Sequence, residues 1–161
     1  MQNEIKEPVD RDAYYEHILI PSDQTFIWRL DDYPWRRNVW NFHPEYELHL
    51  IRKSSGLCYI GDYIGTFEPG QLTLVGSNLP HNWITLPADD EIVPERDIVV
   101  QFDPDAILKA TALLPEISIC RPLFDKAQYG VEFSATVAGE ARGILEAMGD
   151  SSGLTRLSLM L

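Results

Sequence analysis

The stretch from Asn41 to Ile51 limits how this chain can fold, because charged and apolar side chains alternate along it. Four odd-numbered positions carry imidazole or carboxylate groups: His43, Glu45, Glu47 and His49. The even-numbered positions between and after them include Tyr46, Leu48 and Leu50. Alternate residues of an extended strand share a face, so the pattern predicts one polar and one apolar face. Buried charges must be paired, protonated or bound to metal. The polar face is therefore predicted to line a polar cavity or to meet solvent.

Short apolar segments separated by turn residues run through most of the chain. Segments rich in β-branched and aromatic residues predict strands at 14–20, 25–30, 39–51, 57–60, 63–67, 71–75, 81–86 and 97–102, with a return to the sheet at 130–133. Glycine, proline, asparagine and aspartate occupy most of the breaks. Many short strands with frequent turns are typical of a β-sandwich or barrel.

The last third of the chain predicts helices. Asp103 and Pro104 form a helix start before residues 106–114, and residues 117–127 are compatible with another helix. Ser134 is the predicted cap of a helix whose apolar stripe is Val137, Ala141, Ile144, Leu145 and Met148. A second helix follows Ser152, with leucines at 154, 157 and 161. The apolar pattern is still running at Leu161, which predicts that the chain continues in a longer protein.

Composition narrows the function classes. The 161 residues fit one domain, and 45% hydrophobic residues fit a globular protein. The 13 basic and 25 acidic residues give a formal charge of -12, which disfavours nucleic-acid binding by this segment. Cys58 and Cys120 have no metal-type spacing, so a reducing, cytoplasmic location is expected. No run approaches the roughly 20 apolar residues of a membrane span. Residues 1–13 are polar and are predicted to form a flexible arm.

Two motifs in this chain resemble those of the cupin superfamily of small β-barrels. Counted back from Gly56, the ligand positions of the first motif are His43, Glu45 and His49. Counted from Gly70, the histidine of the second motif is His81. The resemblance implies a mostly β, cupin-like double-stranded β-helix barrel in which these four residues meet. They would bind one divalent transition metal, such as zinc, nickel, iron or manganese. The alternative is a hydrogen-bonded polar pocket wall without metal, with Glu47 partly outside it.

A narrower resemblance is to the N-terminal sensor domains of AraC-type transcription regulators. It rests on the segments 43–48, 59–62 and 67–70, on the run Asn78-Leu79-Pro80-His81-Asn82-Trp83, and on residues 130–134 followed by two helices. The resemblance implies a barrel over residues 14–133 with a short helical insertion. It also implies dimerisation or linker helices over residues 134–161. DNA binding would then reside in a C-terminal domain that this sequence does not contain.

The expected ligand is a small polar effector, a sugar or sugar acid by the habit of the family. Its predicted contacts are His43, Glu45, Glu47, His49, His81 and Trp83, with the Trp83 ring as the stacking surface. Three function classes remain open: a sensing and dimerising module without enzyme activity, which we favour; a metal-dependent cupin enzyme such as a sugar isomerase or dioxygenase; and a sugar-binding domain with no regulatory partner. The unfinished last helix favours the first class.

Overall fold

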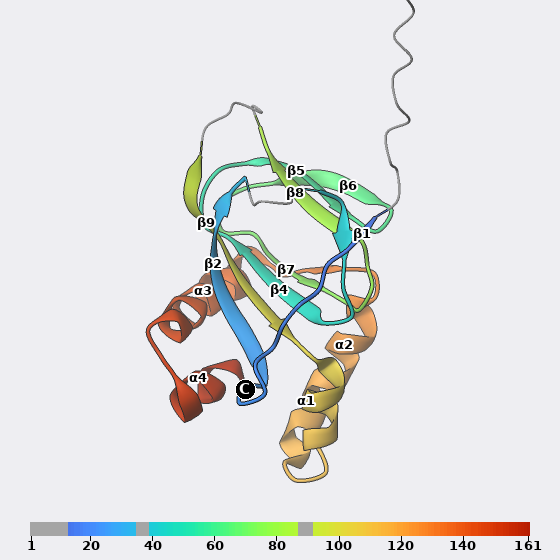
Figure 1. The fold of residues 1–161 in the computed structure, drawn as a ribbon, viewed down its shortest axis with the longest axis vertical. Coiled ribbons are helices and arrows are strands. Elements are labelled where there is room, and N and C mark those ends of the chain that lie inside the picture. The colour runs from blue at the N-terminus through green and yellow to red at the C-terminus, as the bar shows by residue number, and fades with distance from the viewer. Residues whose placement is uncertain (1–12, 35–38, 87–91) are drawn as a thin grey trace, which may run out of the picture.

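Two five-stranded sheets form the body of the molecule. The computed structural model describes residues 13–34, 39–86 and 92–161, so nearly all of the predicted N-terminal arm lies outside the described residues. One sheet has the strand order β1-β3-β8-β5-β6, from β1 (Tyr14–Tyr15), β3 (Asn41–Phe42), β8 (His81–Thr85), β5 (Gly56–Ile60) and β6 (Tyr63–Phe67). The other has the order β10-β7-β4-β9-β2, from β10 (Val131–Glu132), β7 (Leu72–Val75), β4 (Tyr46–Ile51), β9 (Val93–Phe102) and β2 (Phe26–Tyr33). The sheets curl around a shared interior (Figure 1).

The second sheet separates polar from apolar side chains by residue parity. Even-numbered residues face outward and join a core with the helices, including Leu48, Leu50, Leu74, Val100 and Phe102. Odd-numbered residues such as Glu47, His49 and Gln101 form the inner, polar set. The register keeps this division across strands, because Leu48 pairs with Leu74 on β7 and with Val100 on β9. Each fully buried aliphatic side chain of the outer core contributes about 1.5–3 kcal/mol.

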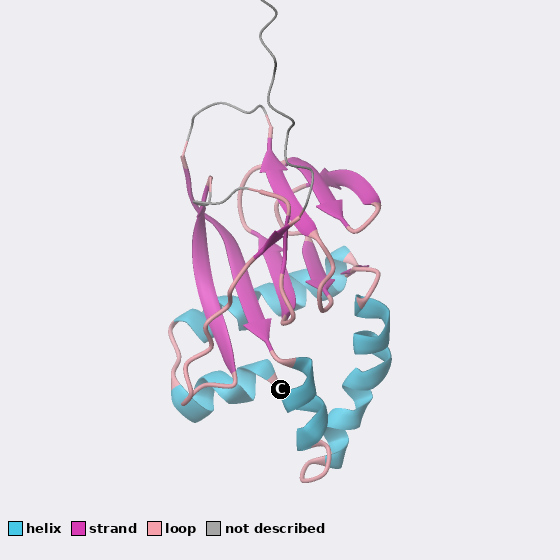
Figure 2. Ribbon diagram, turned by 45° about the vertical axis from the view of Figure 1, so that its right-hand side comes forward, coloured by secondary structure: helices cyan, strands magenta, loops and turns pink. Residues whose placement is uncertain are grey.

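Helices cover the outer face of this sheet (Figure 2). They are α1 (Pro104–Ala110), a short 3-10 helix η1 (Pro115–Cys120), α2 (Arg121–Ala127), α3 (Ala135–Gly149) and α4 (Gly153–Met160). The predicted cap at Asp103 is confirmed, since its side chain accepts a hydrogen bond from the Asp105 backbone N–H. Ser134 caps α3 through the Val137 N–H. No helix among the described ranges is long and apolar enough to cross a membrane. The predicted class, mostly β and cupin-like with C-terminal helices, is confirmed.

The predicted long strand over residues 39–51 is wrong. The chain forms β3, bends at His43, Pro44 and Glu45, and then enters β4 in the opposite sheet. Proline has no backbone N–H to donate to a strand ladder, so a crossing between sheets is accommodated at Pro44. The bend means that residue parity does not carry from β4 back to Glu45.

Three other expectations about the elements are corrected. The first predicted strand is reduced to β1, because only two residues pair with β3. Strand β2 runs on through Asp31 and Asp32, where a break was predicted. In α3 the buried stripe is Ala138, Leu145 and Met148, whereas Val137 and Ile144 are 44% and 46% exposed. The stripe is rotated because α3 packs on Trp28 of β2, whose indole N–H donates to the Leu145 carbonyl.

Candidate functional site

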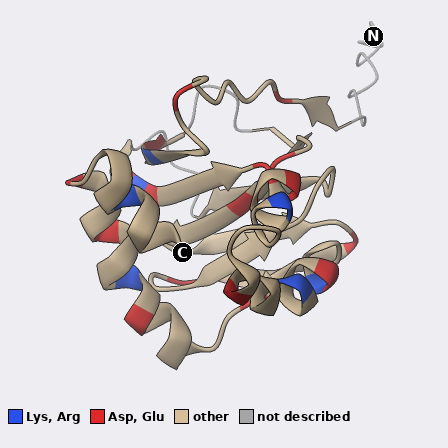
Figure 3. Ribbon diagram, turned by 90° about the horizontal axis from the view of Figure 1, so that it is seen from below, with Lys and Arg blue, Asp and Glu red and all other residues tan. Residues whose placement is uncertain are grey.

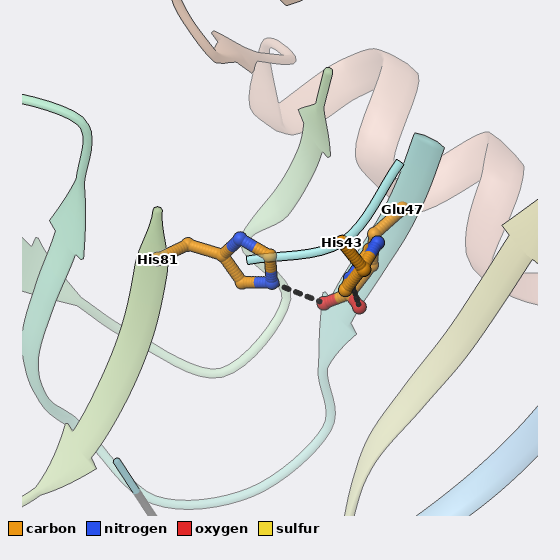
Figure 4. Close-up of side chains that lie close together, drawn as sticks. All are labelled: His43, Glu47 and His81. Carbon is orange, nitrogen blue, oxygen red and sulfur yellow. Dashed lines mark hydrogen bonds and ion pairs between the residues drawn. The ribbon is translucent and has the colours of Figure 1, made fainter. Parts of the chain in front are cut away.

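His43, Glu47 and His81 meet between the two sheets. Glu47 comes from β4, His81 from the start of β8, and His43 from the bend before β4 (Figure 4). One nitrogen or oxygen of each residue lies within 4.8 Å of the others. Glu47 Oε2 is 3.2 Å from His43 Nε2, and Glu47 Oε1 is 3.7 Å from His81 Nε2. All three residues are buried, so the cluster is shielded from bulk water.

Backbone hydrogen bonds fix how both imidazoles face the cluster. His43 Nδ1 is 3.0 Å from the Glu45 carbonyl, and His81 Nδ1 is 2.8 Å from the Leu79 carbonyl. A carbonyl can only accept, so each Nδ1 carries the proton and each Nε2 turns toward Glu47. Histidine ligands of metals are oriented in this way by their outer nitrogen. Two imidazole nitrogens and one carboxylate are a donor set that suits zinc or iron and leaves coordination positions open. The residues therefore fit a transition metal.

Glu47 is the centre of a buried hydrogen-bond network. Gln101, on β9, donates from Nε2 to Glu47 Oε2 at 2.7 Å, and His49 Nδ1 donates to Glu47 Oε1 at 2.8 Å. Burial alone would raise the pKa of Glu47, but the charge of His81 and hydrogen bonds from the neighbouring histidines hold it well below its usual range. Burial lowers the pKa of His43, but its hydrogen bond to Glu47 outweighs this, so that pKa is raised. The ionised carboxylate is thus available as a metal ligand or an acceptor.

A chain of alternating charges extends from Glu47 through His49 to Asp97 and Arg96 on β9. His49 Nε2 is 3.4 Å from Asp97 Oδ1, and Asp97 Oδ2 is 2.6 Å from Arg96 Nη2. Burial disfavours the charged imidazole, yet Asp97 and Glu47 together raise the pKa of His49 to about 9. The His49 ring also stacks on Trp83 at a centroid distance of 3.9 Å. His49 is therefore held between two carboxylates and the Trp83 ring, and it is not part of the cluster of His43, Glu47 and His81.

A small cavity of about 60 Å³, partly open to solvent, lies beside the cluster. Glu16, Arg29 and Asp31 are part of its lining, with Arg29 Nη2 3.1 Å from the Asp31 carboxylate. Burial raises the pKa of both acids, although Arg29 opposes the rise. Buried groups here include Trp83 Nε1 and Asp97 Oδ1, which have no hydrogen-bond partner among the described residues. Such a set of donors and acceptors can be satisfied by a small polar ligand.

The structure brings together most of the residues predicted from sequence, with two changes. His43, His81 and Glu47 form the metal-type cluster, and Glu47 is central, so the expectation that it lies partly outside the pocket is wrong. Glu45 is not in that cluster. Its carboxylate lies 3.7 Å from His43 Nδ1, the ring nitrogen that does not face Glu47, and the residue also lines a separate surface hollow with Asp103. His49 and Trp83 line the cavity, with His49 engaged by two carboxylates.

Sequence reasoning missed the residues that β2 and β9 contribute. Arg29 and Asp31 on β2, and Asp97 and Gln101 on β9, all lie on the inner face. Each pair has the alternate spacing of one strand face, so the signal was present. It was not used because the pairing of β4 with β9 and of β9 with β2 cannot be read from local sequence.

Comparison with known proteins extends only to structure. No family model matches the sequence, and no curated protein matches it. The fold is similar to that of apo ToxT K231A from Vibrio cholerae strain SCE256, with a TM-score of 0.52 and 11% identity over 85% of this chain and 52% of that chain. The chain thus spans about half of that protein's length.

Two further solved structures are similar at lower scores. A cupin 2 conserved barrel domain protein from Rhodopseudomonas palustris matches with a TM-score of 0.38 and 13% identity, over 59% of this chain and 70% of that one. The plu4264 protein from Photorhabdus luminescens matches with a TM-score of 0.36 and 19% identity, over 70% and 98%.

Proposed function

We propose that this chain is the ligand-sensing and dimerisation domain of an AraC-type transcription regulator, without enzyme activity of its own. The observation that carries the proposal is a polar cavity between the sheets of a two-sheet fold whose outer face is packed with helices. ToxT, which shares the fold, is an AraC-family regulator. Acidic and basic residues are both present on the helices of this chain (Figure 3), and its net charge of -12 disfavours contact with a phosphate backbone, so the proposal assigns DNA binding to another domain.

The effector in this proposal is a small neutral polyhydroxylated molecule of the sugar type. The cavity offers the acceptors Asp31 and Asn41 and the donor Trp83 Nε1, a mixture that hydroxyl groups can satisfy because each both donates and accepts. The lining carries four carboxylates against two guanidinium groups and the charged imidazole of His49, so no excess of positive charge favours a sugar acid over a neutral sugar. The Trp83 ring contributes apolar surface.

Isothermal titration with aldopentoses, aldohexoses and a hexuronic acid tests this proposal. We expect one neutral sugar to bind, and Asp31→Asn to weaken it about tenfold through loss of a charged acceptor. Asp62→Asn, on an exposed turn, is the matched control and should leave binding unchanged. Failure of every neutral sugar to bind, or equal weakening by both variants, would contradict the proposed effector class.

A metal-dependent cupin enzyme is the second candidate, favoured by the cluster of His43, Glu47 and His81. A bound ion would supply Lewis-acid activation of a ligand oxygen or of water. In that case His43 and His81 hold it through Nε2, while Gln101 and His49 orient the Glu47 carboxylate. The cavity would then be the place where the substrate meets the ion.

Metal content separates the two candidates. Protein prepared without a histidine tag and without chelator would contain close to one equivalent of a transition metal if the site is loaded. His81→Gln should then lower metal affinity at least tenfold. The control is His17→Gln, since His17 is exposed and outside the cluster. Less than about a tenth of an equivalent in the wild type excludes a resident metal.

A further inference from the structure

A second, apolar cavity lies on the opposite side of the sheet that carries the polar site. It has a volume of about 620 Å³ and is partly open to solvent. Its floor is the outer face of the sheet at Leu48, Leu74 and Phe102, and its walls are η1, α2 and the end of α4. All of its lining residues except Glu116 and Cys120 are aliphatic, aromatic or methionine. The strand β4 separates the two cavities, since Leu48 lies between Glu47 and His49.

The lining of this cavity leaves apolar side chains in contact with water. Removing such apolar surface from water is favourable, so the open cavity favours an apolar occupant. An apolar cavity does not gain by admitting water, because water needs polar partners there, and it binds apolar molecules instead. The lining is also more exposed than a sealed core, because Ile119 is 83% exposed and Leu161 is 61% exposed. An apolar ligand can therefore enter from the surface.

Glu116 determines the kind of polar end that such a ligand can carry. It is the one charged side chain among the residues that line this cavity in the described part of the chain. It is exposed at the rim, at the start of η1, and no hydrogen bond or ion pair holds its carboxylate among the described residues. A cationic head beside it would be attracted, and a carboxylate head would be repelled. The chain's net charge of -12 acts in the same direction.

We propose that this cavity binds a linear apolar molecule with a cationic amine head, its chain against Leu74 and Phe102 and its amine at Glu116. The proposal is independent of the polar site and of the effector class assigned to it. The probes are hexylamine, octylamine and decylamine, with decanol and decanoate as head-group controls. All are titrated calorimetrically below their aggregation concentrations.

The alkyl chain and the head group make separate contributions that can be measured. Affinity should rise about fourfold per added methylene, the value for burying one CH₂ group. Decylamine should bind about three- to tenfold more tightly than decanoate, because an exposed charge pair contributes little more than that. A series in which affinity does not grow with chain length, or decanoate binding as well as decylamine, would overturn the proposal.

Charge variants distinguish Glu116 from the general acidity of the protein. Glu116→Lys should reverse the order, so that decanoate binds more tightly than decylamine. Glu140→Lys makes the same change on exposed α3, away from the lining, and should keep the original order. Equal effects of both variants would show non-specific attraction of amines and would overturn the assignment.

Substitutions of residues that line the cavity test whether decylamine binds there. Ile117→Trp fills the space and should weaken decylamine at least tenfold. If that variant does not fold, Ile119→Asn at the exposed rim should still weaken it, while Leu113→Asn, 86% exposed and outside the lining, should not. A second copy of the chain is the other possible occupant of the cavity, and sedimentation of the same samples tests for it. If decylamine binds only by displacing a second copy of the chain, the cavity is a subunit interface and the proposal fails.

Discussion

At the scale of single residues, the acids of the inner face fall into two groups with opposite pKa shifts. Hydrogen bonds and positive neighbours lower the pKa of Glu47 and of Asp97 against the effect of burial. Burial raises the pKa of Glu16 and of Asp31 in spite of Arg29. The first pair is satisfied within the protein and stabilises it. Ionised Glu16 and Asp31 lower the free energy of unfolding, which is a property expected of residues that bind a ligand.

Asp97→Asn tests the stabilising pair. It leaves the Arg96 guanidinium, 5% exposed, without its carboxylate partner and removes one of the two acids beside His49. We expect the free energy of unfolding at pH 7 to fall by about 3 kcal/mol. Asp62→Asn, exposed on a turn, should change it by less than about 0.5 kcal/mol. Urea unfolding monitored by circular dichroism gives both values.

The pH dependence of the same variant follows from linkage. The folded-state pKa of Asp97 lies below the ordinary value of 3.8, so its stabilisation is present above pH 3.8 and is lost as the pH falls through the folded value. Below pH 3.8 the difference between wild type and Asp97→Asn should therefore shrink as the pH falls. At higher pH the difference also includes His49, whose pKa Asp97 raises, and this part is lost as the pH rises toward about 9. A difference that grows as the pH falls below 3.8 would contradict the shift assigned to Asp97.

Asp31→Asn should have the opposite effect on stability. Because folding raises the pKa of Asp31, the protonated form is favoured in the folded state. Its stabilisation is present below pH 3.8 and is lost as the pH rises through the folded value. We expect the variant to be more stable than wild type at pH 7 and to lose this advantage at pH 3, in unfolding experiments without ligand. Lower stability at pH 7 would mean that the ion pair with Arg29 dominates.

The site was partly predictable at this scale. His43 and His81 were found because motif spacing does not depend on how the strands pair. Glu47 was found by parity but misplaced, since the bend at Pro44 changes which residues share its face. Gln101 was not found, because its importance comes from contact with Glu47 across the β4–β9 pair.

At the scale of elements, the sheet was predictable as a set of strands but not as an arrangement. Turn residues mark most strand ends correctly, as at Gly61, which adopts the positive φ of a tight turn between β5 and β6. Which strands become neighbours depends on contacts distant in sequence, such as β2 with β9. The rotation of α3 was missed for the same reason, because Trp28 selects the face that packs.

Two glycines of α3 test this packing. A Cβ added at Gly149 would lie 2.6 Å from the Trp28 ring, whereas one added at Gly143 meets nothing within 4 Å. Gly149→Ala should lower the free energy of unfolding by about 1–3 kcal/mol through overpacking. Gly143→Ala should raise it by about 0.5–1 kcal/mol, because alanine is the better helix former. If urea unfolding shows that both substitutions raise the free energy of unfolding by a similar amount, α3 does not pack on Trp28 as described.

At the scale of the whole molecule, one sheet joins a polar interior to an apolar, helix-covered exterior. Strand β2 carries Arg29 and Asp31 on its inner face and Trp28 against α3 on its outer face. A ligand can shift the arrangement of the helices only through a difference in its affinity for two states. Strand β2 contacts both the cavity and α3, so a ligand in the cavity can change the position of α3 through this strand.

Self-association through α4 is the prediction that belongs to the whole molecule. Leu157, Leu159 and Met160 pack on the core, whereas Leu154 is 83% exposed. Exposed apolar side chains on a helix favour an isologous contact with a second copy. The charge of -12 on each copy opposes association, and salt screens that repulsion. We therefore expect a concentration-dependent dimer in sedimentation experiments, strengthened by raising the salt concentration.

Leu154→Glu should weaken this dimer at least tenfold by placing a charge in the contact. Leu113→Glu adds the same charge at a residue that is 86% exposed, in the turn after α1, and should leave the dimer nearly unchanged. Because both leucines are exposed, both variants should fold, and unfolding curves at low protein concentration will check this. Equal weakening by the two substitutions would mean that added charge alone opposes association. A monomer at every concentration up to the millimolar range would remove α4 as a dimer contact.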